Sequence, residues 1–223
     1  ILEICAIASD GCISKALVEQ FSQIPNMSMD SDGDGYYDIL SGFQKSIRGS
    51  DVDAALYYLG IMIEANDMDS IERRLLVTAY EDIGLGNPAA VARCVQAIDA
   101  AKRVGFPEGR IPLAMAIIDL CLSPKSKSAE SAIDAAMSVL RHTSYKVPDY
   151  LRFTPVNMKE EDQYDYNRSD IWNQIQYLPD ALKDTQFYHP QMNSSYEKVL
   201  AQNLEKLRKV KRTSNLAALK KKR

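Results

Sequence analysis

Hydrophobic residues recur every three or four positions along most of the chain, which is the spacing of one face of an α-helix. A clear example is the series Val52, Leu56, Leu59 and Ile63, which follows Asp51 as a potential N-cap. The same spacing, together with capping residues and glycines that end helices, predicts helices over residues 14–23, 36–48, 52–63, 69–83, 88–104, 107–122, 126 or 128 to 140, and 195–207.

Two of these expected helices have distinctive starts. The helix expected from Pro107 carries a hydrophobic stripe that includes Met115, Ile118 and Leu122, and Pro112 one turn into it predicts a kink or restart. The sequence Ser194-Ser195-Tyr196-Glu197 is a capping box, in which the first Ser and the Glu satisfy backbone N–H groups of the first turn.

Short connections between the central helices predict that neighbours pack antiparallel, as stacked helical hairpins. No useful strand alternation is present, so the expected fold is all-α. The segment 147–190 differs, because it contains four prolines, several tyrosines and Trp172, the only tryptophan. We expect this long, irregular Tyr/Pro-rich segment to be ordered against helices or against a second subunit, since Tyr and Trp pack well while keeping a polar group exposed.

Composition narrows the class of protein. The chain has 223 residues, of which 46% are hydrophobic and 26% charged, enough for one large domain or two small ones with a real core. Intrinsic disorder of the whole chain is excluded, and so is a membrane span, since the longest apolar stretch is too short. The four cysteines show no metal-ligand spacing and are expected to be core thiols of a cytoplasmic protein.

Charge is distributed unevenly. From residue 197 onward ten Lys and Arg face two Glu, a net charge of +8, whereas the preceding residues carry 17 basic and 28 acidic groups, a net charge of −11. A basic end on an acidic body suggests contact with a polyanion or with another acidic surface, although a solvated terminus explains the same composition. The candidate DNA contacts are Lys198, Lys206, Arg208, Lys209, Lys211 and Arg212.

The segment 30–38 resembles a calcium-binding loop, with carboxylates Asp30, Asp32 and Asp34 at the right spacing and a Gly at the sixth position. Its twelfth position is Ser41 instead of the bidentate Glu, so we interpret residues 30–35 as an acidic, Gly-rich turn. A calcium-responsive adaptor is the weaker alternative.

The sequence contains none of the nucleophile, zinc-protease or phosphate-loop motifs that signal catalysis. Only His142 and His189 could act as bases near neutral pH, and neither belongs to a nucleophile motif. We therefore expect no catalytic residue and no enzyme activity in this chain.

Several segments resemble the C-terminal part of a known family. They are residues 46–59, 81–85, 107–110, 123–126, 177–180 and 187–188. In this order they are similar to the replication-associated recombination protein A family, which includes the bacterial RarA/MgsA proteins and the eukaryotic Werner-helicase-interacting protein. The resemblance divides the chain into a remnant of the AAA+ lid (1–29), the acidic turn (30–35), a helical oligomerisation domain (36–212) and a basic tail (213–223).

The resemblance implies a clamp-loader-like ATPase whose collar-like helical region forms a homotetramer. It also implies that the whole protein acts on DNA at stalled replication forks, on the nucleoid in the bacterial cytoplasm. It implies single-strand-binding protein as a partner. ATP and magnesium are expected in the full-length protein, but the resemblance places the motifs that bind them upstream of Ile1. This chain has no initiating Met, so we expect it to be a fragment without a cofactor site. The acidic stretch 159–166 departs from the family and weakens the case for DNA binding there.

Two functions therefore remain open. The first is an oligomerisation scaffold, with subunit-contact candidates Phe106, Pro107, Arg110, Trp172 and Tyr177. The second is a DNA-binding helical module that uses the basic residues from Lys198 onward.

Overall fold

A computed structural model of the chain describes residues 14, 34–141, 143–155 and 157–221. The expected lid remnant at 1–29, most of the acidic turn and His142 lie outside the described residues. The helices are α3 (Asp34–Arg48), α4 (Val52–Glu64), α5 (Met68–Thr78), α6 (Pro88–Val104), α7 (Arg110–Leu122), α8 (Ser128–Leu140), α9 (Ser195–Arg208) and α10 (Leu216–Lys221). The expectation of an all-α fold is confirmed: over the described part of the chain there is no strand, only one isolated bridge between Ile175 and Thr213.

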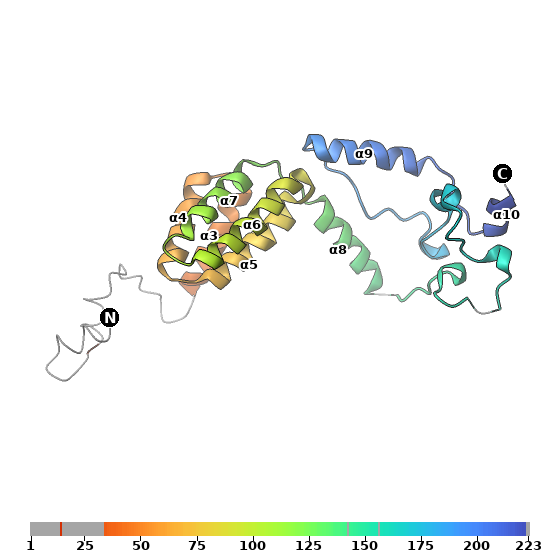
Figure 1. Cartoon of the computed structure of the whole chain (residues 1–223), viewed down its shortest axis with the longest axis horizontal. Helices are drawn as coiled ribbons and strands as arrows, with labels where there is room; N and C mark the ends of the chain where they lie inside the picture. Colours follow the sequence, from red (N-terminus) through yellow and green to blue (C-terminus); the bar gives the residue numbers. More distant parts are fainter. Residues whose placement is uncertain (1–13, 15–33, 142, 156, 222–223) are drawn as a thin grey trace. The chain divides into compact units, whose positions relative to one another are not determined.

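The chain divides into two compact units. The first comprises the residues up to Thr78 together with Ala92–Leu122, and the second comprises Ala79–Val91 together with the chain from Ser123 onward. In the first unit, α3 packs against α4, α5 and α7 (Figure 1). Two ion pairs attach the long α6, one from Arg93 to Asp119 on α7 and one from Lys102 to Glu72 on α5.

The core of the first unit consists of large side chains that the helical spacing places on one face of each helix. The largest of them that are fully buried are Phe43, Ile47, Met62, Ile71, Leu75, Ile98, Leu113, Ile117 and Leu120. Side-chain caps define where the helices begin. Asp51 Oδ1 accepts a hydrogen bond from Ala54 N at 3.0 Å, and Asn87 Oδ1 accepts one from Ala90 N at 3.2 Å ahead of Pro88.

Helix α7 differs from expectation in two ways. It begins at Arg110, so Pro112 lies within the first turn, where its missing N–H needs no partner, and the helix continues to Leu122 without a break. The buried face consists of Leu113, Ala116, Ile117, Leu120 and Cys121, whereas the stripe noted in the sequence is exposed. Because α7 is apolar around nearly its whole circumference, periodicity alone does not show which face is buried.

The second unit contains α8, α9, α10 and the Tyr/Pro-rich segment, which consists of short 3₁₀ turns at 149–151, 160–162, 169–174 and 180–182. This segment is ordered by a small core of its own, as expected for its aromatic residues. Ile171, Ile175, Leu216 and Leu219 are buried together, and Tyr150 and Tyr164 pack against them.

The basic stretch from residue 213 takes part in this small core. Thr213 exchanges backbone hydrogen bonds with Gln174 and Gln176, and Lys220 Nζ donates to the carbonyl of Glu160. The charges of α10 therefore lie on a helix whose leucines are buried, because an amphipathic helix can bury one face while its lysines remain in water.

Candidate functional site

Two of the sequence segments that carry the family resemblance lie against each other in the second unit. The segment 81–85 forms part of a π-helical turn (Ala79–Ile83) and the following 3₁₀ turn (Gly84–Gly86), and Ser126 N donates to the carbonyl of Asp82 at 2.8 Å. A Cβ at Gly86 would lie 2.2 Å from the carbonyl oxygen of Pro124, so only glycine allows this approach. We call residues 79–87, 123–128 and 187–197 together the motif junction.

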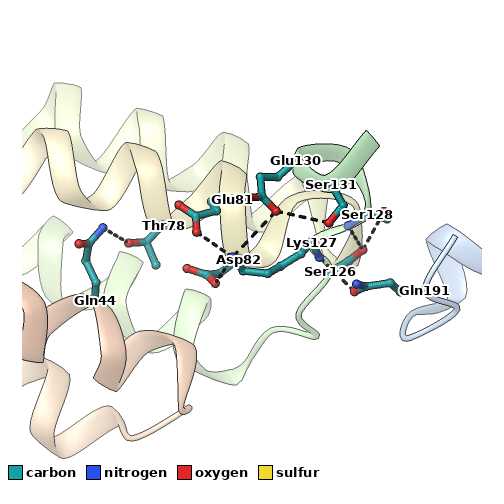
Figure 2. A network of polar contacts seen from close by, with 10 residues as sticks. All are labelled: Gln44, Thr78, Glu81, Asp82, Ser126, Lys127, Ser128, Glu130, Ser131 and Gln191. Carbon is teal, nitrogen blue, oxygen red and sulfur yellow. Dashed lines mark hydrogen bonds and ion pairs between the residues drawn. The ribbon is translucent and has the colours of Figure 1, made fainter. Parts of the chain in front are cut away.

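Lys127 is the central cation of the motif junction. Its Nζ lies 2.7 Å from Glu81 Oε1, 3.8 Å from the buried Asp82 and 4.0 Å from Glu130, and its backbone N–H donates to Gln191 Oε1 (Figure 2). The hydrogen bond to Glu81 raises the pKa of Lys127, so this side chain stays charged at neutral pH. The arrangement fixes the start of α8 relative to the π-helical turn.

Further hydrogen bonds bring the segment before α9 to the same place. Asn193 Nδ2 donates to the carbonyl of Lys125 at 3.0 Å, and Ser194 Oγ donates to the carbonyl of Leu85 at 3.3 Å. Asn87 Nδ2 donates to Ser123 Oγ at 2.9 Å. The bond from Ser194 to Leu85 joins segments more than a hundred residues apart in the sequence.

Glu197 is a functional candidate that the sequence indicated only as a capping residue. Ser194 Oγ does accept from Glu197 N at 3.1 Å, as the capping box predicts. The carboxylate, however, is fully buried and accepts hydrogen bonds from Ser128 Oγ and from Gln191 N, the latter at 3.1 Å. Burial raises its pKa, but the hydrogen bonds from Ser128, Ser126, Gln191 and Tyr188 outweigh burial and leave the pKa below the ordinary value. Glu197 therefore joins the first turns of α8 and α9 as a buried anion.

The subunit-contact candidates fall into two groups, one in each unit. Phe106 and Pro107 lie in the turn between α6 and α7, and Arg110, the first residue of α7, donates from Nη1 to the carbonyl of Pro107 at 2.6 Å. Trp172 and Tyr177 lie together in the other unit, where Tyr177 Oη donates to the carbonyl of Trp172 at 3.0 Å. Their role in subunit contact stays a prediction.

The DNA-contact candidates lie on α9 and in the turn after it. Three of them have partners within the chain. Arg208 donates to the carbonyl of Tyr188 at 2.7 Å, Lys209 pairs with Glu205 at 2.8 Å, and Arg212 lies over the ring of Tyr177. Among the described residues, Lys198, Lys206 and Lys211 have neither a hydrogen bond nor an ion pair from their side chains. Their contact with DNA also stays a prediction.

Helix α7 of the first unit has an exposed apolar face. Ile111, Met115, Ile118 and Leu122 follow one another at helical spacing, and their exposed fractions range from 41% to 69%. We call these four residues the α7 stripe. Isolated exposed hydrophobic residues are normal, but a contiguous stripe on one helix is typical of an interaction surface.

Metal binding, cysteine chemistry and membrane insertion have little support in the part of the chain that the structure describes. No group of three or more His, Cys, Asp and Glu there could hold a metal ion. Of the three carboxylates of the possible calcium loop, Asp30 and Asp32 lie outside the described residues and Asp34 is the first residue of α3. Cys94 and Cys121 are buried thiols, and burial raises the pKa of Cys94 to about 12. Within the same residues, no helix has the length and apolar character needed to cross a bilayer.

Comparison with known proteins agrees with the resemblance seen in the sequence. Residues 49–208 match the family model described as "MgsA AAA+ ATPase C terminal". The replication-associated recombination protein A of Bacillus subtilis is 49% identical over 92% of this chain and 51% of its own length. That of Haemophilus influenzae is 37% identical over 88% of this chain and 46% of its own length.

A eukaryotic relative also matches. The ATPase WRNIP1 of Dictyostelium discoideum is 30% identical over 82% of this chain and 22% of its own length. The chain spans about half the length of the bacterial relatives and a smaller part of this one. The match in order across both units, together with the family model, shows that the chain belongs to the MgsA AAA+ ATPase C-terminal family.

Proposed function

We propose that this chain is the oligomerisation and scaffold region of a clamp-loader-like AAA+ ATPase that acts in replication-fork maintenance and recombination. The names of its relatives support the setting, since several are called replication-associated recombination protein A. In this proposal the chain itself hydrolyses no ATP, and ATP and magnesium bind elsewhere in the full-length protein. The whole protein would work on the nucleoid in the bacterial cytoplasm, with single-strand-binding protein as a partner.

The observation that carries the proposal is the α7 stripe. Of the two charged residues of α7, Asp119 is paired with Arg93 and Arg110 folds back onto the turn before the helix, so the stripe itself contains no charge. An uncharged apolar stripe is complementary to a second copy of itself across a twofold axis. Covering it in this way removes four large side chains from water, which favours association by the hydrophobic effect.

Mass measurement in solution tests this proposal. We expect the chain at tens of micromolar to sediment as an oligomer, and Met115→Glu to weaken the association at least tenfold, because it places a charge at the centre of an apolar interface. Val77→Glu, at an exposed apolar position on α5, is the matched control and should leave the mass unchanged. A monomeric wild-type chain at these concentrations would contradict the proposal.

DNA binding is a second candidate function, favoured by the three lysines that have no partner within the described residues. If they contact phosphates, the affinity for single- or double-stranded DNA should be highest at low salt and decrease steeply as salt is added. The double variant Lys198→Ala with Lys211→Ala should reduce the slope of the logarithm of the binding constant against the logarithm of the salt concentration by about two. Fluorescence anisotropy of labelled oligonucleotides measures both. Absence of binding at low salt would reject this candidate.

A further inference from the structure

The Tyr/Pro-rich segment of the second unit contains a hollow of about 550 Å³. Five aromatic rings line this hollow, which we call the aromatic groove: Tyr150, Phe153, Tyr164, Tyr166 and Tyr177. The exposed fractions of Phe153 and Tyr166 are 102% and 81%, so both rings are almost wholly in water. Exposed aromatic rings that gather around one hollow are typical of a binding site.

Three of the rings are fixed by contacts within the chain. Tyr150 Oη donates to the carbonyl of Gln176 at 2.6 Å, and Tyr177 Oη donates to the carbonyl of Trp172 at 3.0 Å. Tyr164 stacks on Trp172, with the ring centroids 6.3 Å apart. Tyr150 and Tyr164 also pack against the small core of this unit. A ligand therefore meets preformed walls, which lowers the entropic cost of binding.

A second hollow, with acidic residues in its wall, adjoins the aromatic groove. Tyr164 and Tyr166 line both hollows. Glu160 and Glu161 line the second one, and both side chains are exposed. Among the described residues, neither carboxylate has a hydrogen bond or an ion pair. Unpaired carboxylates beside an aromatic groove favour a ligand that carries positive charge.

The charge of the whole segment points the same way. From Asp149 to Asp180 there are seven acidic and three basic residues, a net charge of −4. Two residues of the basic end of the chain also reach this region, since Lys220 Nζ donates to the carbonyl of Glu160 and Arg212 lies over the ring of Tyr177. With these two, the net charge is still −2. Such surroundings repel the phosphates of a nucleic acid and attract a basic ligand.

The backbone of the segment limits how a peptide binds there. The segment consists of short 3₁₀ turns, and among its described residues there is no strand, so a peptide has no sheet edge to extend. Grooves lined by aromatic side chains instead bind the polyproline II helix, which is extended and makes no internal hydrogen bonds. This helix has about three residues per turn, so basic residues at every third position lie along one edge.

We propose that the aromatic groove binds a proline-rich segment of a partner protein, in the polyproline II conformation and with basic residues along one edge. The prolines pack on Phe153, Tyr166 and the fixed rings beside them, and the basic residues point to Glu160 and Glu161. The site lies wholly within the second unit and needs no second copy of the chain, so it is independent of the proposed self-association.

Binding of short synthetic peptides to the whole chain tests the proposal. The probe is a fluorescently labelled peptide of Arg-Pro-Pro repeats, and fluorescence anisotropy gives its affinity. Peptides of Glu-Pro-Pro and of Arg-Gly-Gly repeats should each bind at least about tenfold more weakly, because the first reverses the charge and the second lacks the rigid conformation and the proline rings. Trp172, the only tryptophan, stacks on Tyr164, so its fluorescence should change when the Arg-Pro-Pro peptide fills the groove.

Substitutions in the rings locate the site. Phe153→Ala and Tyr166→Ala should each weaken binding of the Arg-Pro-Pro peptide about fivefold or more, because each removes an aromatic anchor. Both side chains are exposed, so the variants should fold as the wild type does. Tyr196→Ala is the matched control, since Tyr196 is an exposed aromatic residue of the same unit that lies on α9 and not in the groove.

A charge reversal tests the acidic wall. Glu161→Lys should weaken binding of the Arg-Pro-Pro peptide about threefold at low salt, and the effect should diminish at high salt because the charges are exposed. Asp134→Lys is the matched control, since it makes the same change of charge at an exposed position of α8, and it should leave the affinity unchanged.

Four outcomes would overturn the proposal. The first is no binding of the Arg-Pro-Pro peptide at concentrations up to about 1 mM. The second is equally tight binding of the Arg-Gly-Gly peptide, which would show attraction by charge alone. In the third, the ring variants lower the affinity for a labelled single-stranded oligothymidine and leave that for the peptide unchanged, which would assign the groove to nucleic acid. In the fourth, they alter the sedimenting mass of the chain and not peptide binding, which would assign it to a subunit contact.

Discussion

Replacing Glu197 with alanine is expected to lower the free energy of unfolding of the second unit by about 3 kcal/mol, because it leaves one buried donor and two part-buried donors without their acceptor. The donors are Ser128 Oγ, the backbone N–H of Gln191 and Tyr188 Oη, which approaches at 3.4 Å. Trp172, the only tryptophan, lies in the same unit, so its fluorescence during urea unfolding reports the change. Glu205→Ala is the matched control, since Glu205 is on the same helix but exposed, and its loss should leave the free energy of unfolding nearly unchanged.

The same carboxylate should make the second unit sensitive to acid. The folded state lowers the pKa of Glu197 below its ordinary value of 4.5. Its contribution to stability is therefore complete above that value and is lost as the pH decreases through the folded-state pKa. Glu197→Gln should be less stable than wild type at pH 7, and the difference should shrink as the pH falls below 4.5. A difference that stays constant as the solution is acidified from neutral pH to well below that value would show that the ionised carboxylate is not the source of the stability.

Replacing Phe43 with alanine is expected to lower the free energy of unfolding of the first unit by about 3–5 kcal/mol, the cost of a large cavity in a packed core. Phe43 is fully buried on α3, the helix that packs against α4, α5 and α7. Far-ultraviolet circular dichroism follows this unit, because α3 to α7 contain most of the helical residues. Tyr37→Ala, at an exposed aromatic position on the same helix, is the control.

The outcome for Phe43 also tests the division into two units. If the units unfold independently, the circular dichroism transition should move to lower urea while the Trp172 transition stays in place. A shift of both transitions by the same amount would show that the units unfold together. Tyr37→Ala should change neither by more than about 0.5 kcal/mol, because its side chain is largely in water.

Most helices were predictable from the sequence because their signals are local. Asp51, Asn87 and Ser194 cap the helices that they were expected to cap, and Ser128 begins α8 as one of the two expected starts. A cap acts within three residues, so it is visible without knowledge of the rest of the fold. The family resemblance was also visible, since its segments are short and occur in order.

The buried face of α7 and the role of Glu197 were not predictable in this way. Met115 and Ile117 are both hydrophobic, and only packing against α3 and α4 buries Ile117 and leaves Met115 exposed. Glu197 has the spacing of an ordinary capping residue, and only the approach of Ser128 and Gln191 turns it into a buried anion. Nothing in the sequence near Glu197 indicates those two partners.

By itself, the sequence determined the all-α class, the position of most helices and the family, because helical periodicity, capping and short motifs are properties of neighbouring residues. Only the tertiary structure decided which apolar faces are covered, how the segments 81–85 and 123–126 meet at Gly86, and that the basic stretch after residue 213 buries Leu216 and Leu219. The physical reason is that burial and hydrogen-bond partners depend on residues distant in sequence, whose approach is set by the packing of the whole unit.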